Sequence, residues 1–106
     1  MSDATGHPAD SVRLDATVVG RVQGVGFRWF VLDVAQRLDL RGWVANEADG
    51  SVRCVAEGPR AVLDALLREL ADGPLGARVE RVVPRWSPSG SNLGPFEIRS
   101  GAHPGD

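Results

Sequence analysis

Apolar and polar residues alternate along the first strongly patterned stretch of the chain. Apolar side chains occupy every second position from Val12 to Val18, and Val22 continues the series with a glycine in the gap. A period of two is typical of a strand that buries one face and exposes the other. The pattern therefore predicts a half-buried strand over residues 12–22.

Two later stretches carry apolar residues at helical spacing. The first runs from Phe27 to Leu38, directly after a glycine-rich segment, and the second follows Pro59 and ends before the Gly-Pro pair at positions 73–74. Apolar residues three and four apart form one stripe of a helix. A proline is tolerated in a first helical turn, where the missing N–H would have no partner. Both stretches are predicted to be amphipathic helices.

A hairpin is predicted between the two helices. Residues 41–47 and 51–57 have the composition of short strands, and Asp49-Gly50 between them accepts the positive φ angles of a tight turn. Residues 77–86 predict a fourth strand, in which Pro84 lacks a ladder donor and is tolerated mainly at a sheet edge. Residues 96–99 predict a short last strand.

The element order β-α-β-β-α-β plus a tail strand is that of an α+β, ferredoxin-like sandwich. It predicts an antiparallel sheet with core order 4-1-3-2, two helices on one face and the fourth strand at an edge. One domain is expected over residues 12–99, with polar extensions at 1–11 and 100–106. A chain of 106 residues has no room for a second domain.

Charge and composition narrow the classes of partner. The net charge of −2 and the pI of about 5.6 supply no overall basic field for nucleic acid or anionic lipid. No apolar run approaches the roughly 20 residues of a membrane span, and the N-terminus lacks the layout of a signal peptide. We expect a monomeric, cytoplasmic protein that binds neither nucleic acid nor membrane.

The inventory of reactive side chains is small. Cys54 is the single cysteine, and the only histidines, His7 and His103, lie in the polar ends. Metal and iron–sulfur sites need clusters of such residues, so no metal and no cofactor are expected. All basic residues are arginine. Anion binding therefore depends on guanidinium groups and backbone N–H groups, both of which suit phosphate.

One strand-to-helix junction concentrates features of an anion site. Residues 20–28 contain three glycines and two arginines. Glycines let backbone N–H groups converge without Cβ obstruction, and the helix start adds its own N–H groups and positive dipole end. Arg28 falls in the first helical turn, where the dipole disfavours a cation unless an anion lies between them. The alternative is an exposed arginine on a glycine turn. The predicted phosphate site consists of Arg28 and the backbone of Gln23, Gly24, Val25, Gly26 and Phe27.

Other polar and aromatic residues have simpler interpretations. Asn46 ends a predicted strand, where an asparagine taken alone is more often a turn residue. Glu47 and Glu57 have no evident partner and are expected to be solvated. The three tryptophans, Trp29, Trp43 and Trp86, are expected to pack, rather than to stack on a substrate.

Taken together, these segments resemble the acylphosphatase family. The resemblance rests on residues 20–28, on Gly42-Trp43-Val44 with Asn46, on residues 57–59 and on residues 96–99, and it spans about residues 12–99. It implies a ferredoxin-like, metal-independent hydrolase that cleaves small carboxyl phosphates such as acetyl or carbamoyl phosphate. It also implies that Arg28 binds the phosphate and that Asn46 positions the attacking water. Pro84 and the longer ends depart from the family's pattern.

The residue types suit this reaction even when the family resemblance is set aside. A carboxylate leaves readily, and phosphoryl transfer is catalysed mainly by positioning and electrostatics, so donors matter more than bases. Two other classes of protein remain open. One is a non-catalytic ferredoxin-like module for RNA or a regulatory anion, although an RNA-binding sheet needs exposed aromatics and a basic balance. The other is a module detached from a larger carbamoyl-transfer enzyme.

Overall fold

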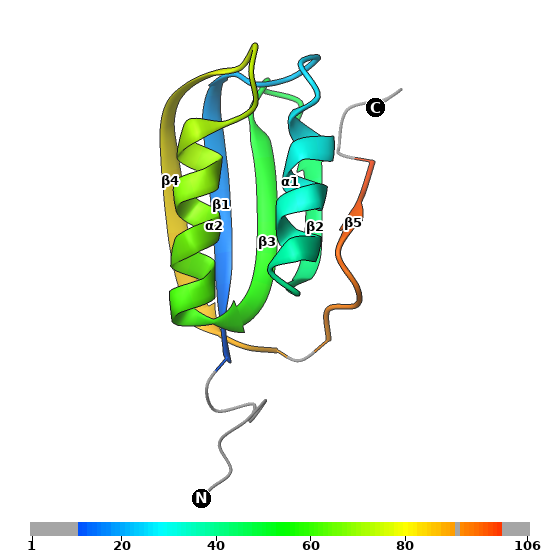
Figure 1. The fold of residues 1–106 in the computed structure, drawn as a ribbon, viewed down its shortest axis with the longest axis vertical. Helices are drawn as coiled ribbons and strands as arrows, with labels where there is room; N and C mark the ends of the chain where they lie inside the picture. The colour runs from blue at the N-terminus through cyan, green and yellow to red at the C-terminus, as the bar shows by residue number, and fades with distance from the viewer. Residues whose placement is uncertain (1–10, 91, 101–106) are drawn as a thin grey trace, which may run out of the picture.

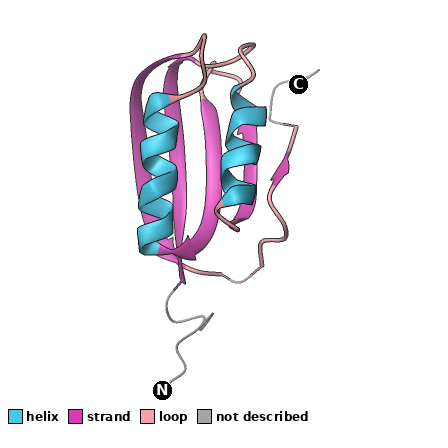
Figure 2. Cartoon of the chain, viewed as in Figure 1, coloured by secondary structure: helices cyan, strands magenta, loops and turns pink. Residues whose placement is uncertain are grey.

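A computed structural model describes residues 11–90 and 92–100, so His7, His103 and most of the predicted polar extensions lie outside the described residues. The elements are β1 (Ser11–Arg21), α1 (Phe27–Arg37), β2 (Arg41–Asn46), β3 (Val52–Pro59), α2 (Arg60–Asp72), β4 (Arg78–Pro88) and β5 (Glu97–Ile98). Both helices cover one face of a single sheet (Figures 1 and 2). The predicted element order and the two-layer α+β fold are confirmed. Neither described helix has the length and apolar character needed to cross a membrane.

The sheet has the order β4-β1-β3-β2-β5. Its four-stranded core is antiparallel and has the predicted order 4-1-3-2. β5 joins β2 in parallel, with Trp43 opposite Glu97, so the complete sheet is mixed. β4 and β5 thus form the two edges (Figure 1). Pro84 lies in β4, opposite Ala16, where the other side of the strand needs no donor, as predicted.

The alternation of β1 defines the core. Leu14, Ala16 and Val18 are fully buried beneath the helices, whereas the residues between them lie on the uncovered face of the sheet. Phe27 of α1 and Leu63 of α2 are among the large side chains of the same core cluster, each at most 1% exposed. The apolar stripes of both helices therefore face the sheet, as their spacing predicts.

Cys54 of β3 lies in the same core. It is fully buried, and burial raises the pKa of its thiol to about 12. The neutral thiol packs as a small apolar group.

Two glycines are required inside strands rather than in turns. Gly20 has φ 139°, and a Cβ there would lie 2.2 Å from the carbonyl oxygen of Arg78. Gly42 has φ 144°, and its Cβ would lie 1.9 Å from the carbonyl oxygen of Val55. Neighbouring strands thus approach too closely for any side chain at these positions.

Pro59 and Glu57 differ from expectation. Pro59 ends β3 and precedes the first turn of α2, with an extended ψ of 143°.

Glu57 was expected to be solvated, which is wrong. It is 6% exposed and accepts hydrogen bonds from Arg13 Nε at 2.7 Å, Gly90 N at 2.8 Å and Ser89 Oγ at 3.1 Å. Burial would raise its pKa, but these hydrogen bonds outweigh it and lower the pKa below the ordinary value. The carboxylate thereby anchors the connection that carries the chain from β4 to β5.

The three tryptophans differ in their environments: two contact arginine side chains and one is exposed. The guanidinium of Arg60 lies 3.6 Å from the ring centroid of Trp86, and Trp43 lies between Arg53 and Arg99 at 5.3 and 5.2 Å. Trp29 is 68% exposed, so the expectation that it packs is wrong.

Candidate active site

The predicted site residues come from segments that meet at one end of the sheet. β1 ends at Arg21, the glycine loop follows, and α1 begins at Phe27, while β2 runs toward the same end and finishes at Asn46. Figure 1 shows the β1–α1 loop and the β2–β3 turn at this end, called here the loop end of the sheet.

The loop glycines are needed for conformation and not for packing. Gly24 has φ 76° and Gly26 has φ 80°, both in the left-handed region. A Cβ at either position would meet no atom within 4 Å. The loop therefore leaves open space beside its backbone, where an anion could approach the N–H groups.

The start of α1 continues this donor surface. Gly26 caps the helix without any side-chain hydrogen bond, and the first turn contains no acidic residue. The first N–H groups of a helix have no acceptor within it, and they carry the positive end of the helix dipole. Arg28, in the same turn, is half-buried. This end of the helix thus suits a negatively charged ligand.

Gln23 has a function that the sequence pattern did not indicate. Its side-chain Nε2 donates hydrogen bonds to the carbonyl oxygens of Glu47 at 2.8 Å and Ser51 at 3.0 Å. Its predicted role was that of a backbone donor alone. The one available signal was a long amide side chain among small residues. The contact fastens the glycine loop to the β2–β3 turn.

Asn46 lies in a strand and not in the turn that follows it. It is the last residue of β2, opposite Val52, and is 8% exposed. Val44 and Val52, which share its side of the sheet, are fully buried beneath the helices. The Asn46 side chain is therefore on the helix-covered face, at the loop end, where α1 packs against β2.

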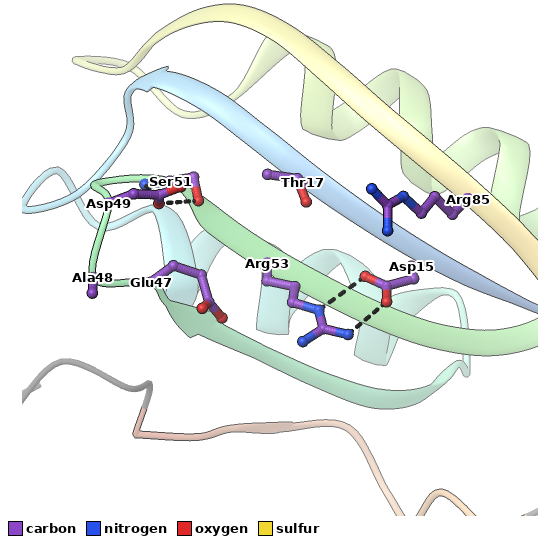
Figure 3. A pocket seen from close by; sticks show the side chains of 8 residues that line it. All are labelled: Asp15, Thr17, Glu47, Ala48, Asp49, Ser51, Arg53 and Arg85. Atoms are coloured by element: carbon purple, nitrogen blue, oxygen red, sulfur yellow. Dashed lines mark hydrogen bonds and ion pairs between the residues drawn. The ribbon is translucent and has the colours of Figure 1, made fainter.

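A separate hollow of about 510 Å³ lies on the opposite, uncovered face of the sheet (Figure 3). Arg53 crosses its floor and donates to both carboxylate oxygens of Asp15, at 3.0 and 2.6 Å. At one end, the Ser51 hydroxyl and amide donate to Asp49 and lower the pKa of its carboxyl. The residues lining it are Asp15, Thr17, Glu47, Ala48, Asp49, Ser51, Arg53 and Arg85.

The hollow and the predicted phosphate site are different places. Neither Arg28 nor Asn46 lines it, and nor does any of residues 23–27. Its three carboxylates outnumber its two guanidinium groups, so it does not favour a dianion. The loop end, with the N–H groups of a helix start and Arg28, is the better candidate for a phosphate. Across residues 11–90 and 92–100, no group of three His, Cys, Asp or Glu side chains is arranged to hold a metal ion.

Comparisons with known proteins show the family of the chain. The sequence profile of the family Acylphosphatase matches residues 14–98. An acylphosphatase of Salinibacter ruber is 49% identical over 87 residues, covering 82% of this chain and 92% of the relative. One of Anaeromyxobacter sp. is 48% identical, covering 86% of this chain and 98% of the relative.

Solved structures give the same result. The crystal structure of acylphosphatase from Bacillus subtilis aligns with a TM-score of 0.80 at 36% identity, covering 83% of this chain and 98% of that one. Full-length HypF in its phosphate- and nucleotide-bound form aligns with a TM-score of 0.78 at 29% identity, but over only 12% of its length. The profile match and the relatives at nearly half identity, which align along almost their whole length, establish that this chain belongs to the acylphosphatase family.

Proposed function

We propose that the chain performs its family's reaction at the loop end of the sheet, hydrolysing the carboxyl–phosphate bond of small acyl phosphates to a carboxylate and inorganic phosphate. One observation carries the location. A loop with two left-handed glycines leads into an uncapped helix start that bears Arg28 and no acidic residue. This combination suits a phosphate dianion.

The backbone N–H groups of residues 23–27 and the guanidinium of Arg28 bind the phosphate oxygens. Phosphoryl transfer passes through a loose transition state whose charge is spread over these oxygens, so fixed donors stabilise it directly. A planar guanidinium can donate to two oxygens at once, which a single ammonium group cannot match.

Asn46 orients the attacking water from the neighbouring strand end. The water attacks phosphorus in line with the leaving carboxylate, the P–O bond breaks, and the carboxylate departs without needing a proton. The residues assigned to the site carry no base at neutral pH, and the Glu47 side chain lines the hollow on the other face. A phosphate oxygen of the substrate therefore accepts the proton that the water loses.

The chain acts as a monomer on small molecules. Charged side chains occupy the uncovered face of the sheet, where Asp15 and Arg53 already satisfy one another. Such a face gives little apolar surface for a partner to bury. We further propose that the protein works in the cytoplasm and binds neither nucleic acid nor membrane, which its net charge of −2 supports. Size-exclusion chromatography with light scattering checks the monomer, and a dimer mass would contradict it.

Phosphate binding and turnover can be tested separately. Inorganic phosphate should stabilise the folded protein by roughly 2.7 kcal/mol at 100 times its dissociation constant. Arg28→Ala should remove both turnover of acetyl phosphate and most of this stabilisation. Asn46→Ala should slow turnover by about 10²- to 10³-fold, the cost of one preorganised donor, while phosphate still stabilises the protein.

Matched control variants test the roles assigned to Arg28 and Asn46. Arg28→Lys keeps the charge but not the fork and should lose on the order of 10³-fold in rate. Arg37→Lys, at the other end of the same helix, should change the rate less than about twofold, because Arg37 forms a solvent-exposed ion pair with Asp33. An Arg28→Lys enzyme within a few-fold of wild type would remove Arg28 from the site. Retained turnover in Asn46→Ala, or loss of the phosphate effect in that folded variant, would remove Asn46 from its role.

The same assays address a non-catalytic anion-binding module. A protein that phosphate stabilises but that releases none from acetyl, carbamoyl or benzoyl phosphate would bind without turnover. The proposed reaction requires phosphate release at a rate that rises in proportion to enzyme concentration.

A further inference from the structure

Ten of the twelve arginines fall into two groups; the other two are Arg28, in the proposed site, and Arg41, which donates to the carbonyl oxygen of Leu93. Five of them form ion pairs with an acidic side chain: Arg13, Arg37, Arg53, Arg60 and Arg99. Within residues 11–90 and 92–100, Arg21, Arg68, Arg78, Arg81 and Arg85 make no hydrogen bond or ion pair. Arg68 lies on α2, and the other four all belong to β1 and β4.

Strand register places these four side chains on one surface. Arg85 lies opposite Asp15, Arg81 opposite Val19, and Arg78 opposite Arg21. Asp15 and Val19 alternate with the buried Ala16 and Val18, so Arg85 and Arg81, which lie opposite them, are on the uncovered face. A register shift after Val19 leaves Glu80 as an extra residue of β4, and Arg21 and Arg78 are adjacent to Val22 and Val79, which pack on the core, so both also lie on the uncovered face. At about 3.3 Å per residue, the row along β4 covers roughly 20 Å and ends at the loop end. We call this row, with Arg21, the arginine strip (Arg21, Arg78, Arg81 and Arg85).

Electrostatic repulsion within the arginine strip destabilises the sheet. Like charges directly opposite on neighbouring strands destabilise a sheet, and Arg21 faces Arg78 with no acid paired to either. Asp15 is already held by both donors of Arg53. Charges on an edge strand discourage sheet-to-sheet aggregation, which accounts for Arg81 and Arg85 on β4. It does not account for Arg21, because β1 is a central strand.

Position suggests a use for this charge. Arg21 is the last residue of β1, and the chain passes from it directly into the glycine loop. Arg21, Arg78 and Arg81 therefore concentrate positive charge along β1 and β4 beside the glycine loop, whereas the carboxylates of the hollow lie at the β2–β3 turn and at Asp15, in a protein whose net charge is negative. Clefts and surfaces of one sign raise the local concentration of ligands of the opposite sign.

We propose that the arginine strip attracts the phosphate dianion of the substrate to the loop end and thereby raises kcat/KM without touching the reacting group. This inference rests on the proposed function. Arg21 and Arg78 act at a distance through their charge, whereas Arg28 contacts the phosphate. Their effect must therefore disappear when salt screens it, and that of Arg28 must not.

The test compares the double variant Arg21→Gln/Arg78→Gln with Arg68→Gln, which removes another exposed arginine without an ion pair among the described residues, from the helical side. kcat and kcat/KM for acetyl phosphate are measured at about 0.01 M and about 1 M ionic strength, where the Debye length is roughly 30 Å and 3 Å. The double variant should lose about tenfold in kcat/KM at low salt, keep its kcat, and match wild type at high salt. Arg68→Gln should stay within about twofold of wild type.

Two further readouts do not depend on turnover. The dissociation constant of inorganic phosphate, from its effect on melting temperature, should rise in the double variant at low salt only. Either single substitution, Arg21→Gln or Arg78→Gln, should raise the melting temperature without phosphate by about 1–4 °C, because it relieves the like-charge pair.

Several outcomes would overturn the proposal. They are an unchanged kcat/KM, a loss that persists at high salt, an equal loss in Arg68→Gln, or a lower melting temperature in the single variants. Salt-sensitive binding of a short DNA duplex that the double variant abolishes would instead make the strip a nucleic-acid surface. If Arg28→Ala removes turnover while the double variant matches wild type, only the strip is wrong. If Arg28→Ala keeps turnover, the proposed site itself is wrong.

Discussion

Gln23 in the glycine loop donates a hydrogen bond of 2.8 Å to the carbonyl oxygen of Glu47, the residue directly after Asn46. A second bond from the same amide nitrogen reaches Ser51 at the far side of the turn. One side chain thus ties the loop predicted to bind phosphate to the strand end predicted to orient water. Because in-line attack needs these two groups in a constant relative position, Gln23 is a positioning residue for the proposed reaction.

Gln23→Met keeps the length of the side chain and removes both donors. We expect a loss of up to about 10²-fold in kcat, since small misplacement of reacting groups has effects of that size. The free energy of unfolding should fall by about 1–2 kcal/mol for the lost hydrogen bonds. The matched control is Gln36→Met on the exposed side of α1, which should alter neither quantity measurably. A Gln23→Met enzyme with wild-type kcat would show that the glycine loop keeps its position without the two hydrogen bonds of Gln23.

Gly24 and Gly76 offer a matched pair for the loop itself. Both have positive φ, 76° and 97°, and a Cβ at either would meet no atom within 4 Å. Alanine should therefore cost a similar strain of about 1–2 kcal/mol at each position, measured by denaturant unfolding. Gly24→Ala should also lose about 10²-fold in turnover, because its methyl group would occupy space beside the loop N–H groups. Equal turnover in the two variants would contradict a phosphate site at Gly24.

Glu57 should contribute a stability that depends on pH. Its pKa is lowered in the folded protein, so its stabilisation is complete above the ordinary glutamate value of about 4.3 and is lost as the pH falls through the folded value. Glu57→Gln should lose about 1–3 kcal/mol at pH 7, because the donors of Arg13 and Gly90 lose their anionic acceptor. The difference from wild type should shrink below about pH 4.

A control for Glu57 lies at the edge of the sheet. Glu97 pairs with Arg99 at 2.8 Å, but its side chain is 55% exposed. Glu97→Gln should change the free energy of unfolding by less than about 1 kcal/mol between pH 3 and pH 7. Chemical unfolding across that range measures both variants, and a pH-independent difference for Glu57→Gln would disprove the charge-based account.

Turnover should survive exhaustive treatment with EDTA. The chain has one cysteine and two histidines, and the described residues contain no cluster of ligands for a metal ion. In the proposed mechanism, backbone N–H groups and Arg28 stabilise the charge of the transition state. Phosphate release from acetyl phosphate before and after chelation measures this, and activity that disappears and returns with Mg²⁺ or Zn²⁺ would refute the mechanism.

Most of the fold could be predicted from local patterns in the sequence. The alternation from Val12 to Val18 and the helical stripes of α1 and α2 each arise because one side of an element is buried, so they are legible without knowing the partner. Edge placement of Pro84 also followed, since a missing donor is harmful in a central strand and harmless at an edge. The glycine spacing and Arg28 indicated an anion site for the same kind of local reason, the geometry of N–H groups at a helix start.

The tertiary structure decided every feature that depends on residues distant in sequence. Gln23 meets Glu47 only because β1 and β2 end at the same side of the sheet, and Glu57 is buried only because the β4–β5 connection passes over it. The parallel pairing of β5 with β2 and the like-charge pair of Arg21 with Arg78 are consequences of register. Side-chain chemistry sets what each residue can donate or accept, but its partners, and hence its burial and its pKa, are chosen by which strand lies alongside.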